Sequence, residues 1–328
     1  MSDSTATLAP IGERDATWRP DMRLLSVGAA LVLALVPLWA GGFWVYSVSL
    51  LLANSINILS VSFLIRYAGE VSIGHNFFIA VGAYTVAVLQ NSLGVPLIGS
   101  LLVAVCLSMV MGLLFALPSR GLSGVYLSVA TLALGLAVPE MLLYFSNFTG
   151  GFEGLFVDSQ IIQGLPAEAQ QYYVALLALC CAAFAVYRFR HSRIGLVILT
   201  ARDHPHAAAS FGMTSGTARL STFAVSAAIA GLGGAVLGFT TSMVSPNSFT
   251  FWNSVTLLVG SVVSLYSTRI YGVIVGGAFI TATPQLLSNY GQLISIIHGL
   301  TLLGVILMAN IGVPFLVRFV RRRRNRYV

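Results

Sequence analysis

Long apolar runs separated by short polar breaks fill most of the chain. A membrane-spanning helix needs about 20 mostly apolar residues, and ten runs come close to that length or reach it. The sequence therefore predicts an all-α polytopic membrane protein with one membrane domain over residues 24–312. The ten expected spans are Leu24–Ala40, Phe43–Ile65, Val71–Gln90, Pro96–Leu117, Leu122–Phe145, Tyr172–Tyr187, Leu220–Ser242, Asn253–Thr268, Tyr271–Leu287 and Gln292–Ile311.

The positions of the basic residues orient these spans. All 17 basic residues are arginine, and cytoplasmic loops carry the excess of basic residues. With a cytoplasmic N-terminus, every arginine falls on the inner side, and the charged residues of the outer segments are all acidic. We therefore expect both termini in the cytoplasm: an N-terminal segment 1–23, a long loop 188–219, and a basic tail 313–328 that contacts anionic membrane lipid.

Composition excludes several classes of protein. The chain is 57% hydrophobic and 8% charged, whereas a soluble domain carries about 25% charged residues. A soluble enzyme, a disordered chain and a nucleic-acid-binding protein are therefore excluded. A P-loop needs a lysine, so this chain has no nucleotide site of that kind. The three cysteines match no zinc or redox spacing, and neither cofactor nor metal is predicted.

The loop 188–219 contains a candidate docking helix. Asp203 is a plausible N-cap, Pro205 suits the first turn, and Gly212 is a natural C-terminal stop. The pattern predicts an amphipathic helix of two to three turns, in which small side chains allow close approach to a cytoplasmic partner; the alternative is an inert surface loop. The residues assigned to it are Arg202, Asp203, His204, Pro205, Ala207, Ala208 and Gly212.

Polar residues inside spans are candidates for a translocation path. Asn54 and Asn57 share one face of the second span, His75 begins the third, and Glu140 follows a proline in the fifth. Bonding between helices, or within a kinked helix, is the alternative for each. No cluster of carboxylates and no Ser/His/Asp set occurs, so an enzyme is not indicated.

Glycines concentrate in the third and seventh spans. Small residues let membrane helices approach closely, and the glycines concerned serve either packing or gating. They are Gly74, Gly82, Gly231 and Gly234.

Several motifs, in order along the chain, resemble those of a known family. They are the run Gly69–Phe78 with Gly82-Ala83-Tyr84, the run Gly124–Leu132, the loop residues Ala201-Arg202, Ala207-Ala208 and Phe211-Gly212-Met213, and the run Ala230–Ala235 followed by Val244-Ser245-Pro246. Together they resemble the branched-chain amino-acid permease family, the M-type subunit of the leucine/isoleucine/valine ABC importer.

The resemblance implies a permease subunit in the inner cell membrane that forms half of a translocation path. It implies a second homologous permease, two cytoplasmic ATPase subunits and an extracytoplasmic substrate-binding protein as partners. Ten spans also divide into two sets of five, and the odd number implies an inverted repeat. Urea, amides or aromatic acids are alternative substrates, and an ion-driven secondary transporter or a membrane enzyme are rival classes.

Two departures from the family pattern stand out. The family usually has a Gly-Gly-x-Gly run before the ninth span, where this chain has Val263-Ser264-Leu265-Tyr266. The family's docking loop usually reads Arg-Glu-Asn-Glu, where this chain has Arg202-Asp203-His204-Pro205-His206. We expect altered packing at the first position and fewer acidic contacts with the ATPase at the second.

Overall fold

The computed structural model describes residues 37, 39, 41–121, 124–162, 164–286, 296–297, 299–300 and 303–304. The chain divides into two units, residues 1–40 and 41–328, and the second unit is the one described below. The expected spans Leu24–Ala40 and Gln292–Ile311 lie mostly outside the described residues, and segments 1–23 and 313–328 lie entirely outside them.

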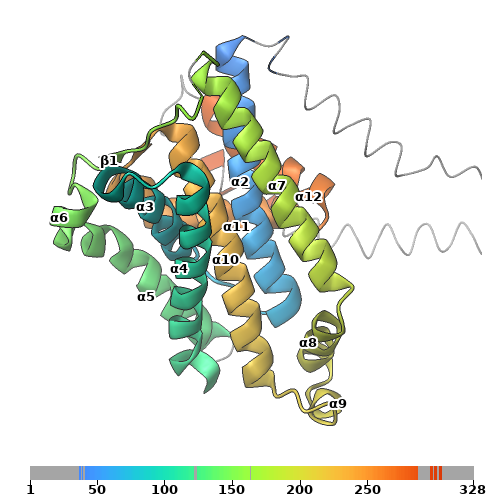
Figure 1. The fold of residues 1–328 in the computed structure, drawn as a ribbon. Helices are drawn as coiled ribbons and strands as arrows, with labels where there is room; N and C mark the ends of the chain where they lie inside the picture. The colour runs from blue at the N-terminus through green and yellow to red at the C-terminus, as the bar shows by residue number, and fades with distance from the viewer. Residues whose placement is uncertain are drawn as a thin grey trace, which may run out of the picture. The chain divides into compact units, whose positions relative to one another are not determined.

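Helices dominate the described part of the chain, and one two-stranded sheet accompanies them (Figure 1). In chain order the elements are α2 Gly42–Ala68, α3 Asn76–Leu93, α4 Leu97–Ala116, η1 Pro118–Gly121, α5 Val125–Tyr144, α6 Ser146–Thr149, β1 Leu155–Phe156, α7 Ala167–Arg190, α8 Arg193–Asp203, α9 Pro205–Ala209, α10 Ser215–Thr241, β2 Met243–Val244, η2 Pro246–Phe249, α11 Phe251–Val263 and α12 Ile270–Leu286. Strands β1 and β2 are antiparallel, with Leu155 opposite Val244.

Six of these helices, α2, α3, α4, α5, α7 and α10, are long and apolar enough to cross a membrane. The apolar helices α11 and α12 are shorter, with 13 and 17 residues. The mainly helical fold fits the predicted multi-pass membrane protein. Eight of the ten expected runs correspond to helices, with shifted boundaries.

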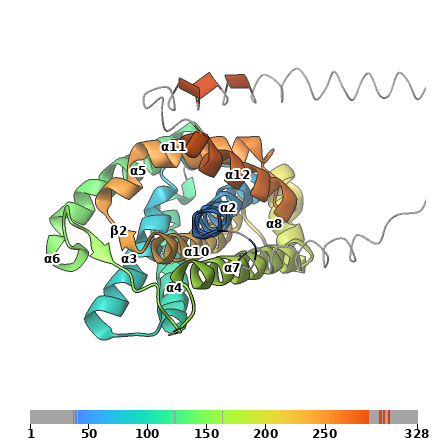
Figure 2. The same cartoon turned by 90° about the horizontal axis from the view of Figure 1, so that it is seen from above.

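Helix α2 lies among the other helices and carries much of the core. In the view of Figure 2 it is seen nearly end-on, with α7, α10 and α12 around it. A helix that is apolar on every side is expected to be buried, and Leu52, Ile56 and Phe63 of α2 are almost completely shielded from solvent.

Helices α2 and α10, each of 27 residues, pack against each other in antiparallel directions. Asn57 lies beside Gly233, the hydroxyl of Ser226 donates to the carbonyl of Ser60 at 2.8 Å, and Leu64 shares an apolar cluster with Phe223. Residue numbers rise along α2 as they fall along α10, which establishes the direction.

The expected third span, Val71–Gln90, is wrong at its beginning. Helix α2 ends at Ala68 and is capped by Gly69, whose φ of 71° is in the left-handed region. Residues 69–75 are not α-helical, and α3 starts at Asn76. We call Gly69–His75 the interrupted segment. Its deep end is inside the bundle, since the ring Nε2 of His75 lies 2.9 Å from the hydroxyl of Ser60 on α2. A second stretch without α-helix, residues 242–250, separates α10 from α11 and contains β2 and the short 3-10 helix η2.

Candidate translocation path and docking region

A cavity of about 590 Å³ lies between α2, α10, α11 and α12. None of the described residues that line it is charged; this lining combines apolar side chains with amides and hydroxyls. The polar members are Asn54, Asn57, Asn76, Asn253, Gln285, Thr241, Ser248, Thr256 and Thr281. Such a surface solvates a net-neutral polar molecule and gives an isolated ion no counter-charge.

Hydrogen bonds across the cavity walls join elements far apart in sequence. The amide of Asn54 donates to the hydroxyl of Thr281 at 3.1 Å, linking α2 to α12. The amide of Asn76 donates to the carbonyl of Thr250 at 3.4 Å, so the start of α3 meets the stretch before α11. Asn57 is 1% exposed, and its Oδ1 has no partner within the described residues.

The structure brings together only part of the predicted path. Asn54 and Asn57 both line the cavity, whereas His75 and Glu140 do not. His75 is buried behind the wall against Ser60, and Glu140 is exposed on α5. Sequence reasoning did not single out Thr281 or Asn253, because single polar residues in apolar helices carry no periodic signal.

The four glycines predicted to serve packing or gating lie at close contacts between elements. A Cβ on Gly82 would overlap the carbonyl oxygen of Gly231, and one on Gly234 would overlap the carbonyl oxygen of Ile79, so α3 crosses α10 at these positions. Gly74 is not on a helix as expected; it lies in the interrupted segment, against Thr131 of α5. These contacts account for packing; a gating role stays a prediction.

We call α8, α9 and the turn that follows them to Met213 the docking region. It differs from the predicted docking helix in three ways. Asp203 is the last residue of α8 rather than an N-cap, and His204 precedes α9 in that position. Helix α9 has only five residues, with Pro205 in its first turn. Ala208 is fully buried, so its side chain does not face a partner. The sequence analysis does not predict helix α8, because its apolar run is too short to span a membrane.

The turn after α9 ends as a glycine stop should. The amide of Met213 donates to the carbonyl of Ala208, that of Gly212 to the carbonyl of Ala209, and Gly212 has a φ of 74°. This is the Schellman arrangement. It leaves His204, Pro205, His206, Ala207 and Phe211 exposed around the turn.

Arg202 connects this region to α2. Its Nη1 donates to the backbone carbonyl of Arg66 at 2.5 Å, in the last turn of α2, and its Nε lies 3.5 Å from the carboxylate of Asp203. The ion pair is half exposed, so it adds little stability. The bond to the helix end fixes α8 against α2, because terminal carbonyls lack partners inside their own helix.

Residues 44–310 match the family described as the branched-chain amino acid transport system permease component. The chain belongs to that family. The members of that family are transport permease components, and the expected family is confirmed.

Curated relatives of the permease agree. It is 26% identical over 260 residues to the high-affinity branched-chain amino acid transport system permease protein LivM of Salmonella typhimurium, covering 71% of this chain and 61% of that protein. The Escherichia coli protein of the same name is 26% identical over 263 residues, with the same coverage. A probable branched-chain amino acid transport permease protein LivM from Methanocaldococcus jannaschii is 27% identical over 184 residues, 53% of each chain. The permease thus spans about 61% of the length of the first two relatives. No solved structure matches it.

Proposed function

We propose that this chain is the permease subunit of an ABC importer for branched-chain or related amino acids in the inner cell membrane. It forms half of the path, and a second homologous permease forms the other half. Two cytoplasmic ATPase subunits drive it, and an extracytoplasmic binding protein delivers the substrate. The single observation that carries the proposal is the cavity between α2, α10, α11 and α12, whose described lining residues include several amides and no charged side chain, in a chain of this family.

The cavity favours a zwitterion over an anion. An amino acid has no net charge at neutral pH, and an aliphatic side chain matches apolar lining residues such as Leu50, Ile79 and Ile280. The helix α11 begins at the cavity wall, near Trp252, and the positive end of a helix dipole favours a carboxylate. An aromatic acid would bring an unbalanced charge. Urea and short amides are the second candidate, because the amide lining suits them equally well.

The proposed topology has ten spans in two inverted sets of five, with both termini in the cytoplasm. The antiparallel pair α2 and α10 supports the inversion, because each is followed by a stretch without α-helix and then by a shorter α-helix, α3 or α11. On this topology α8 and α9 face the cytoplasm and dock the ATPase subunits. The strand β1 lies on the outer side.

The experiment that tests the function is transport in proteoliposomes. With its permease partner, ATPase subunits and binding protein, the chain should take up leucine only when ATP is supplied on the side of the membrane that carries the ATPase subunits. An excess of isoleucine should compete, and benzoate should not. Uptake by the chain alone, driven by a proton or sodium gradient, would contradict the importer.

Orientation is tested by cysteine labelling in a background where Cys106, Cys180 and Cys181 are replaced by serine. Both Gln160 and Ser210 are exposed. Gln160→Cys should react with an impermeant maleimide added to intact cells, and Ser210→Cys should react only in inverted vesicles. Equal labelling of both positions in intact cells would contradict the topology.

A further inference from the structure

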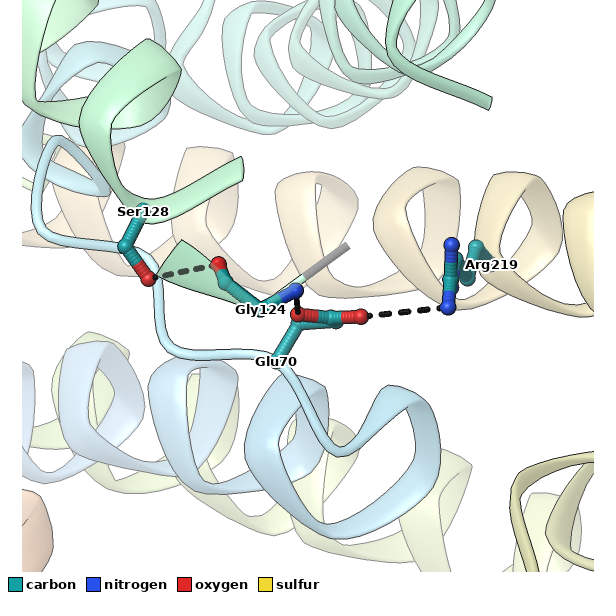
Figure 3. A network of polar contacts seen from close by, with 4 residues as sticks. All are labelled: Glu70, Gly124, Ser128 and Arg219. Carbon is teal, nitrogen blue, oxygen red and sulfur yellow. Dashed lines mark hydrogen bonds and ion pairs between the residues drawn. The ribbon is translucent and has the colours of Figure 1, made fainter. Parts of the chain in front are cut away.

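Glu70 is a nearly buried carboxylate at the end of the bundle that carries α8 and α9. Its side chain is 7% exposed. Its Oε2 accepts a hydrogen bond of 2.8 Å from the amide of Gly124, which precedes α5, and its Oε1 lies 3.4 Å from Nη2 of Arg219 on α10 (Figure 3). Burying a carboxylate is costly without such partners. Glu70 therefore ties three separate parts of the fold together.

The interrupted segment beyond Glu70 is bonded along the first half of α5. The hydroxyl of Ser128 donates to the carbonyl of Val71 at 2.9 Å, and the amide of Ile73 donates to the hydroxyl of Thr131 at 3.1 Å. Next, Gly74 packs against Gly135 with no space for a side chain. Because these contacts follow one another residue by residue, the interrupted segment and α5 form one hydrogen-bonded unit.

The docking region contacts this unit at Gly69, the first residue of the interrupted segment. The Arg202 side chain that bonds the end of α2 also lies over Gly69, where an added Cβ would be 3.4 Å from its Nε. On the other side, Arg219 lies in the second turn of α10, which begins directly after the docking loop with a Thr214–Thr217 capping box. A displacement of the docking region therefore reaches the interrupted segment through two arginines, one of which acts through Glu70.

We propose that Glu70 is the positioning residue that makes the interrupted segment and α5 follow α10 when the ATPase subunits move the docking region. This inference rests on the proposed importer function. The far end of the interrupted segment leads to Asn76 in the cavity wall, so its position determines the shape of the path. Glu70 itself does not touch the substrate, and its substitution should separate ATP hydrolysis from transport.

The test uses the complete reconstituted transporter. Glu70→Gln keeps an acceptor for the Gly124 amide and removes the charge that faces Arg219, and Arg219→Gln removes the other half of the pair. Both should keep ATP hydrolysis while leucine uptake per ATP falls by about tenfold or more, the scale of coupling for groups in one network. Arg219→Lys, which keeps the charge, should recover most of the loss. Glu153→Gln, which neutralises an exposed carboxylate, is the matched control.

A second readout does not depend on transport. Ser72 lies in the interrupted segment and is 2% exposed. In the cysteine-free background, Ser72→Cys should react slowly with a maleimide and about tenfold faster when Glu70→Gln is added, but not when Glu153→Gln is added. This comparison remains valid if the wild-type complex shows no ATP-driven uptake, a result that would reject the proposed function alone. Unchanged labelling, or normal uptake per ATP in the Glu70→Gln complex, would overturn the inference.

Discussion

Gly82 of α3 lies so close to Gly231 of α10 that a Cβ on Gly82 would overlap the carbonyl oxygen of Gly231. On its other side Gly231 faces Ser108 of α4, again with no space for a Cβ. Three helices therefore meet at two glycines. At Gly82 the obstacle is the backbone of Gly231, so no change of rotamer can accommodate a methyl group there.

Gly82→Ala should lower the thermal stability of the purified permease in detergent. Alanine favours a helix by about 1 kcal/mol over glycine, but forcing a methyl group into a packed site costs typically about 1–3 kcal/mol, and here the obstacle is backbone. The matched control is Gly42→Ala in α2, where the nearest heavy atom outside that part of the helix, in Glu168, is 3.9 Å from an added Cβ. A melting temperature equal to that of the control would contradict the close crossing.

The sequence predicts these crossings better than it predicts the chain path between them. Apolar run length identifies α2, α4 and α10 because lipid demands continuous apolar helices. The same reasoning fails at Val71–Ile73, which is not helical and bonds instead to Ser128 and Thr131, residues more than fifty positions away. The cavity is likewise partly predictable: Asn54 and Asn57 share a helix face, whereas Thr281 joins them only through the tertiary packing of α12.

The turn between α11 and α12 contains two residues with left-handed backbone that are not glycine. Leu265 and Tyr266 have φ values of 54° and 50°. The amide of Tyr266 donates to the carbonyl of Ser261 and that of Leu265 to the carbonyl of Val262, a Schellman cap in which glycine normally occupies the position of Leu265. A left-handed conformation costs a residue with a Cβ about 1–2 kcal/mol.

Leu265→Gly should therefore stabilise the permease, by about 0.5–1 kcal/mol after the greater backbone entropy of an unfolded glycine is subtracted. Little packing is lost, because Leu265 is 66% exposed. Leu196→Gly is the matched control: Leu196 is 58% exposed in the regular helix α8, and glycine there should destabilise by about 1 kcal/mol. Thermal unfolding in detergent measures both. Destabilisation by Leu265→Gly would refute the strained cap.

The Asn54–Thr281 bond should matter for transport more than for folding. Thr281→Val removes the hydroxyl that accepts from Asn54 in the cavity wall and keeps the side-chain shape. We expect leucine uptake to fall by about tenfold, because a lost polar contact with substrate or wall costs about 1–2 kcal/mol, while ATP hydrolysis continues. Thr85→Val is the control, since the hydroxyl of Thr85 bonds only the carbonyl of Val81 in its own helix among the described contacts. Equal uptake by the two variants would place the path elsewhere.

Neighbouring alanines in α9 separate docking from folding. Ala207 is exposed, whereas the next residue, Ala208, is fully buried. Ala207→Arg should leave thermal stability unchanged, since arginine is a good helix former, but should block the ATPase surface with a bulky cation. A loss of about 3 kcal/mol of docking energy weakens association more than a hundredfold. Ala208→Arg should instead destabilise the fold, because it forces an unpaired charge into a packed site. Co-purification of the ATPase subunits and melting temperature distinguish the two effects. If Ala207→Arg retains normal docking and uptake, the exposed turn from His204 to Phe211 is an inert loop and the ATPase binds another surface.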